Sequence, residues 1–109
     1  MAATKVRVTS GSENVFRDLG LKNPEELLAK TKLAARIVQI VEGRKLTQAQ
    51  AAKLLGIDQP KVSQLYRGRL DAFSLERLMR FLTALDQDVR IVIEGKPRRG
   101  RGRVIVEAA

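Results

Sequence analysis

Residues 46–68 read LTQAQAAKLLGIDQPKVSQLYRG, and this stretch decides the fold. Thr47 and Gln50 have the spacing of a capping box, in which each side chain bonds the backbone N–H of the other residue. The box predicts a short helix over residues 48–55. Gly56 follows at the position where a left-handed residue commonly ends a helix, because glycine has no side chain to oppose a positive φ.

A second short helix is predicted directly after this glycine turn. Asp58 is a good N-cap, and Pro60 falls in the first helical turn, where its missing N–H is harmless. The helix then runs to about Arg67 and ends at Gly68. Two short helices joined by a tight turn indicate a helix-turn-helix.

The second helix has an apolar side and a polar side. Ile57, Val62 and Leu65 anchor it to the core, and the small Ala51 and Ala52 let the preceding helix approach closely. The polar residues recur at i, i+1, i+4, i+5 and i+8, which is one helical stripe. In the major groove, Gln can form two hydrogen bonds with adenine and Arg can form two with guanine. The backbone N–H groups at a helix N-terminus can bind a phosphate. The candidate DNA-binding residues are Gln48 for a phosphate, Lys61 at the edge of the stripe, and Gln59, Pro60, Ser63, Gln64 and Arg67 on it.

A polar stripe is also what any solvent-exposed helix carries. The interpretation as a DNA-reading face therefore depends on the caps, the glycine, the alanines and the apolar anchors agreeing in register.

Two longer helices are predicted to flank the helix-turn-helix. Asn23 and Pro24 are suited to the N-cap and first position of one of them, and Gly43 ends it. Its apolar arc is wide, which predicts burial on more than one side. Ser74 caps the other, whose apolar stripe continues to Leu85.

The apolar period changes from 3.6 to 2 after the last helix. Val89, Ile91 and Ile93 alternate with their neighbours and predict a short strand, and residues 103–107 predict another. We therefore expect a mainly α fold with four to five helices and a short C-terminal β-strand or hairpin. The expected organisation is an N-terminal arm (1–22), a helix-turn-helix domain (23–86) and a C-terminal strand segment with a basic tail (87–109).

The composition favours a polyanionic partner. Of 109 residues, 21 are Lys or Arg and 12 are Asp or Glu, giving a net charge of +9. Such a charge on a small chain favours nucleic acid as the partner, with simple solubility as the alternative reason for the charge.

The absence of Cys and His excludes metal sites that use these ligands and Ser–His–Asp chemistry. No paired carboxylates or phosphate loop indicate an enzyme, so we expect no catalysis, cofactor or metal. No stretch predicts a signal peptide or membrane span, so a cytoplasmic protein is expected.

The segment 46–70 resembles the helix-turn-helix of the lambda-repressor/Cro (Xre) family. From Ser12 to about Glu94, the chain also resembles a subgroup of small Xre-type proteins that act as antitoxins in HigBA-like toxin–antitoxin modules. Besides the segment 46–70, residues 14–20 and 73–78 carry this resemblance. The resemblance implies a lambda-repressor-like domain that binds operator DNA and represses its own operon. It implies a phosphate contact for Gln48 and recognition contacts on the polar stripe.

The expected partners are double-stranded DNA, a second copy of the chain and a toxin. A single short recognition helix reads too few base pairs for useful selectivity, which favours a homodimer on two half-sites. The resemblance implies a small RelE/HigB-like toxin, for which Phe16 and Leu19 in the arm and the 89–93 strand are candidate contacts. Two alternatives stay open. One is a solitary Xre-family repressor without a toxin, and the other is an RNA-binding protein that uses the Arg–Gly-rich stretch within residues 95–102.

Overall fold

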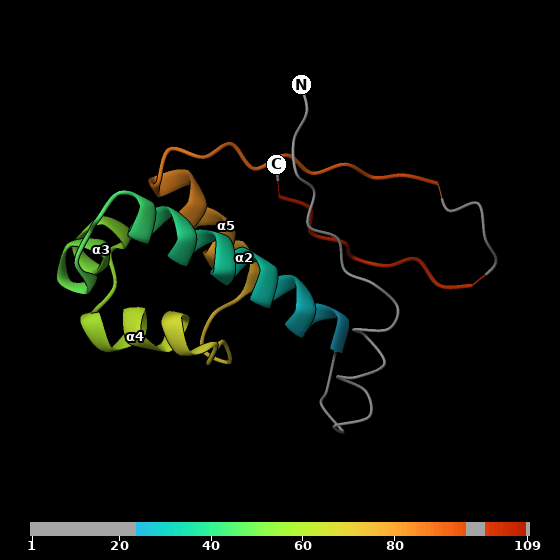
Figure 1. Cartoon of the computed structure of the whole chain (residues 1–109). Coiled ribbons are helices and arrows are strands. Elements are labelled where there is room, and N and C mark those ends of the chain that lie inside the picture. The colour runs from blue at the N-terminus through green and yellow to red at the C-terminus, as the bar shows by residue number, and fades with distance from the viewer. Residues whose placement is uncertain (1–23, 96–99, 109) are drawn as a thin grey trace.

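The computed structural model describes residues 24–95 and 100–108, and the fold in these ranges is mainly helical (Figure 1). The predicted helices are confirmed, including the positions at which the two short ones begin and end. The predicted arm and the Asn23 cap lie outside the described residues. The four helices are α2 (Pro24–Gly43), α3 (Gln48–Leu55), α4 (Gln59–Arg67) and α5 (Leu75–Ala84).

The longest helix is α2, and two of the other helices pack against it (Figure 1). It contacts both α5 and α4, while α3 contacts α4 and α5. As a result α2 buries residues on more than one side, as its wide apolar arc predicts. One side of α4 faces this body and the other is open.

The core consists of apolar side chains from all four helices and from the loop between α4 and α5. Ile37 and Val41 of α2, Val62 of α4 and Leu78 of α5 are each at most 1% exposed. The loop adds Phe73, whose ring meets that of Phe81 edge-on at 5.9 Å between centroids. Within the described residues, no polar or charged side chain is buried.

The C-terminal ends of α2 and α5 are joined by one arginine. The Arg44 guanidinium donates a hydrogen bond to the carbonyl of Leu85, and it lies 3.6 Å from the carboxylate of Asp86. Asp86 has a φ of 62°, so the chain turns out of α5 through a left-handed residue. This contact fixes the point at which the C-terminal segment leaves the helices.

The prediction of a C-terminal β-strand or hairpin is wrong for the described residues. Neither residues 88–95 nor residues 101–108 are assigned to a strand. The chain instead leaves α5 in an extended path and later returns toward α2 (Figure 1). A period-2 pattern produces a strand only when another strand supplies its hydrogen bonds, and no strand lies beside these segments within the described ranges.

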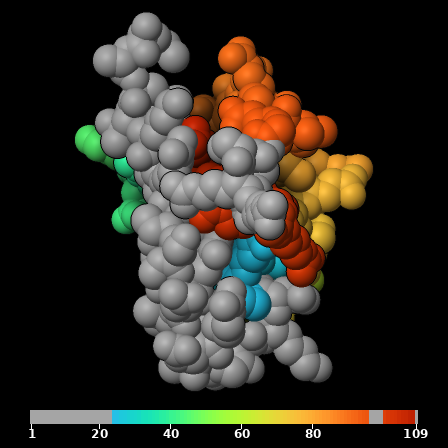
Figure 2. Space-filling view, turned by 90° about the vertical axis from the view of Figure 1, so that its right-hand side faces the viewer, coloured from blue at the N-terminus to red at the C-terminus, as the bar shows by residue number. Residues whose placement is uncertain are grey.

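The returning segment lies against the start of α2. Figure 2 shows residues 100–108 next to the first turns of that helix. The backbone N–H of Val104 donates a hydrogen bond to the Glu25 carboxylate, and Val106 packs against the core. Residues 104–106 are thereby held to the helical body.

None of the four described helices is long and apolar enough to cross a lipid bilayer.

Candidate nucleic-acid interface

The helix α3 begins at the predicted capping box. The Thr47 hydroxyl accepts a hydrogen bond from the Gln50 backbone N–H at 3.0 Å, and the Thr47 N–H donates to the Gln50 side chain at 2.8 Å. Both side chains therefore satisfy backbone groups that a helix start leaves unpaired. Gln48, the first residue of α3, is half-buried and does not take part in the box.

The turn between α3 and α4 is set by a glycine and an aspartate. Gly56 has φ 72° and ψ 32°, which is the left-handed conformation, and its N–H donates to the Ala52 carbonyl. Two residues later, the Asp58 carboxylate accepts from the Lys61 N–H at 2.9 Å and caps α4. These two local conformations fix the direction of α4 relative to α3.

Packing fixes the rotation of α4 about its own axis. Val62 is 1% exposed and Leu65 is 3% exposed, so both face the core. Ala51 of α3 is fully buried in the core, and α3 contacts α4. The predicted anchors are therefore confirmed, and the opposite side of α4 faces outward.

The polar stripe lies on the accessible part of the surface. Gln59, Pro60 and Arg67 are exposed, whereas Ser63 and Gln64 between them are half-buried. Lys61 is also half-buried and lies next to the stripe in sequence. The structure thus brings all the α4 candidates to one short helix, with Gln48 at the start of the neighbouring helix.

The charge of this region is positive. Residues 47–70 contain four basic side chains, Lys53, Lys61, Arg67 and Arg69, against the single acidic Asp58. That carboxylate lies at the start of α4, where the helix dipole favours a negative charge. The net charge of the helix-turn-helix attracts an anionic polymer.

Arg69 is a candidate that the sequence pattern did not indicate. The helix ends at Gly68, which has φ 72°, and the chain turns there, so Arg69 does not continue the helical stripe. Its N–H donates to the Gln64 carbonyl at 2.9 Å, and its side chain is exposed. In the sequence, Arg69 is indicated only by its position two residues after Arg67, on the other side of the capping Gly68.

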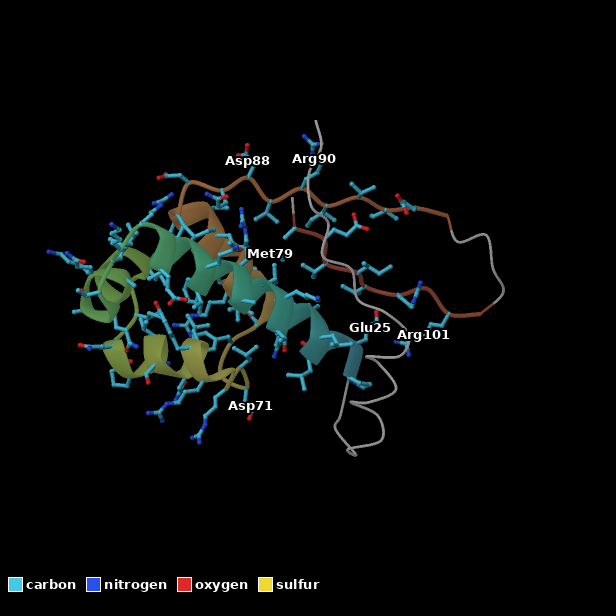
Figure 3. The ribbon with its side chains drawn as sticks, viewed as in Figure 1. Glu25, Asp71, Met79, Asp88, Arg90 and Arg101 are labelled. Carbon is cyan, nitrogen blue, oxygen red and sulfur yellow. The ribbon has the colours of Figure 1, made fainter. Side chains whose placement is uncertain are left out.

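The loop after α4 is held by an aromatic pair under an arginine. The Arg77 guanidinium carbon lies 5.4 Å from the Phe73 ring centroid and 5.6 Å from that of Phe81. Asp71 points outward from this loop, beyond the end of α4 (Figure 3). The cation and the two rings fix the far end of the candidate interface.

Tyr66 lies on the inner side of α4. Burial raises the pKa of its phenol above the ordinary value, and the nearby Glu42 carboxylate adds to the rise. The neutral phenol is therefore the form that this packing favours.

Comparisons with known proteins identify the family. The chain matches a family of helix-turn-helix domains over residues 15–94. A solved chain named as an XRE-family transcriptional regulator is 51% identical to it, with a TM-score of 0.73. The match covers 78% of this chain and 97% of that one. No curated protein matches the chain. With the match over most of its length and the capped α3–α4 pair, the chain belongs to the XRE family of helix-turn-helix transcriptional regulators.

Proposed function

We propose that this protein is a sequence-specific repressor that places α4 in the major groove of operator DNA. The observation that carries the proposal is the outward polar face of α4, on a helix whose direction and rotation are fixed by caps and buried anchors. The diameter of an α-helix fits the width of the major groove, and a fixed orientation is needed if side chains are to meet particular base edges.

The side chains divide into two roles under this proposal. Gln59, Ser63 and Gln64 read base edges, and Pro60 packs among them. Gln48 contacts a phosphate from the start of α3, as the family resemblance implies. The cations Lys61, Arg67 and Arg69 supply phosphate contacts or a guanine contact at the ends of α4.

The first test is replacement of Gln64 by Ala. Affinity for the protein's own promoter fragment should fall by ~1–3 kcal/mol, and the preference at one base pair should relax. Gln39→Ala is the matched control, because Gln39 is an exposed glutamine on α2. Equal losses for Gln64→Ala on promoter and random DNA would show that this residue does not read bases.

The second test is the dependence of DNA affinity on salt. Log K should fall steeply with log [salt], because each phosphate contact releases counterions. Neutralising Arg98, Arg99, Arg101 and Arg103 together should flatten the slope if the basic tail contacts DNA. Tighter binding of structured RNA than of duplex DNA at the same salt would favour the RNA-binding alternative.

We extend the proposal to a homodimer on a two-fold operator. Two recognition helices then meet half-sites about one helical turn apart, roughly 34 Å. Sedimentation of the chain with and without a promoter fragment measures this directly. A single protomer in both conditions at micromolar concentration would contradict the dimer.

The finer role that we propose is that of an antitoxin in a HigBA-like module. Its support is the sequence resemblance to that subgroup, including Phe16 and Leu19, which lie outside the described residues. The test is expression of the adjacent reading frame with and without this protein. If the neighbour is harmless alone, or stays toxic when this protein is abundant, a solitary XRE-family repressor remains.

A further inference from the structure

We propose that residues 90–94 pair with the same residues of a second copy of this chain, as an antiparallel β-ladder across a two-fold axis. This inference rests on the proposed homodimer and names its interface. The segment contains the most exposed large apolar side chains in the described part of the molecule. Ile91 is 74% exposed, Val92 is 66% exposed and Ile93 is 94% exposed.

Three adjacent β-branched residues in water are a poor arrangement for a monomer. Apolar side chains that cluster on a surface commonly mark a protein interface. Val and Ile also favour extended backbone and pack well across a strand pair. Residues 88–95 follow an extended path (Figure 1) and form no ladder with the described residues. The segment therefore has both the conformation and the side chains of an edge strand without a partner.

The charges at the two ends of the segment identify the partner. Residues 90–94 read Arg-Ile-Val-Ile-Glu, with a cation at one end and an anion at the other. When this sequence is paired antiparallel with itself about Val92, Arg90 lies opposite Glu94 of the second copy, and the reverse pair forms as well. Ile91 then lies opposite Ile93. Every position meets a favourable neighbour, which is the self-complementarity that a two-fold interface requires.

The charged ends are available for such a partner. Within residues 24–95 and 100–108, no ion pair holds Arg90 or Glu94. Figure 3 shows Arg90 directed away from the helices. Val89, directly before the segment, packs against the core and anchors it to its own helical body.

The chain's own residues 103–107 are the competing partner. They read Arg-Val-Ile-Val-Glu, so their charge pattern repeats that of residues 90–94. However, Val104 bonds Glu25, Val106 packs on the core, and Arg103 and Glu107 already have interaction partners. The segment 103–107 is therefore engaged, whereas the segment 90–94 is available.

Charge reversal tests the proposed pairing on the full chain in the absence of DNA. Arg90→Glu or Glu94→Arg alone places like charges opposite each other at two positions, so the dissociation constant of the dimer should rise about tenfold or more. The double variant R90E/E94R restores both attractive pairs and should return the dissociation constant to the wild-type value. Lys53→Glu reverses an exposed charge on α3 and should leave it unchanged. Analytical ultracentrifugation measures each dissociation constant, and far-ultraviolet circular dichroism checks the helical fold.

The double variant separates self-pairing from the competing arrangement. If residues 90–94 pair with residues 103–107 of the second copy, R90E/E94R places two like-charge pairs in contact and weakens association further. If they pair with residues 103–107 of their own chain, neither the single variants nor the double variant changes the dissociation constant. Either result, a monomeric wild-type chain, or single variants that dimerise normally would each overturn the proposal. Loss of dimer with retained binding of a half-site fragment leaves the DNA-reading role of α4 standing, whereas loss of DNA binding by an intact dimer contradicts that role alone.

Discussion

Replacing Gly56 by Ala should destabilise the protein by about 1 kcal/mol. Gly56 has φ 72°, and a Cβ built there meets no atom within 4 Å. The change therefore adds no clash, and only the backbone conformation opposes it. The left-handed conformation costs an L-residue about 1–2 kcal/mol. The lower entropy of the unfolded alanine chain offsets about 0.4–1 kcal/mol of that cost.

Gly43→Ala is the matched control, because Gly43 also has open space around its Cβ but lies in α2 without a positive φ. This variant should be more stable than the wild type by about 0.5 kcal/mol. Urea unfolding followed by circular dichroism measures both, at one protein concentration because a dimer links stability to concentration. If Gly43→Ala and Gly56→Ala change the free energy of unfolding in the same direction, the α3–α4 turn does not require a left-handed residue.

Two further predictions concern contacts between the elements. Arg44→Ala should lower the free energy of unfolding by about 1 kcal/mol, mainly through the lost hydrogen bond to the Leu85 carbonyl. Asp86→Asn should lower the free energy of unfolding by less than about 0.5 kcal/mol, because the ion pair between Arg44 and Asp86 is solvent-exposed. Equal losses for the two variants in urea unfolding would contradict this order. Tyr66 is the only tyrosine, so tyrosinate absorbance reports its pKa alone. Because the folded pKa is raised, its contribution to stability is complete below the unfolded pKa near 10 and is lost as pH rises through the folded value. Tyr66→Phe should remove this alkaline loss, and an unfolding free energy with the same pH dependence in both proteins would show that Tyr66 is not its source.

The helix-turn-helix could be predicted because its signals are local. The capping box at Thr47, the glycine turn and the Asp58 cap each depend on residues within three or four positions of one another. Such contacts form in the same way whatever the rest of the chain does. The outward face of α4 then follows from the burial of Val62 and Leu65, so the location of the candidate site could also be predicted.

The packing of α5 could be predicted only in part. Its apolar spacing indicates Leu78 and Leu82, which are buried, and Phe81, which is 4% exposed, falls on the same face at i+3 from Leu78. Phe81 is buried because Phe73, from the loop before α5, meets its ring edge-on and Arg77 lies over both rings. These contacts depend on where the loop returns, which a helical period does not report.

The C-terminal segment shows what an alternating pattern does and does not predict. Alternation at residues 89–93 reports that an extended chain has an apolar face, but it contains no information about which strand lies beside it. Within the described residues, the other β-like segment, residues 103–107, is held by Glu25 and the core. A strand can therefore be encoded in the sequence and still require a second molecule. If the double charge reversal restores the dimer, the pattern at residues 90–94 specifies an interface, and the spacing of the two α4 helices on DNA depends on it.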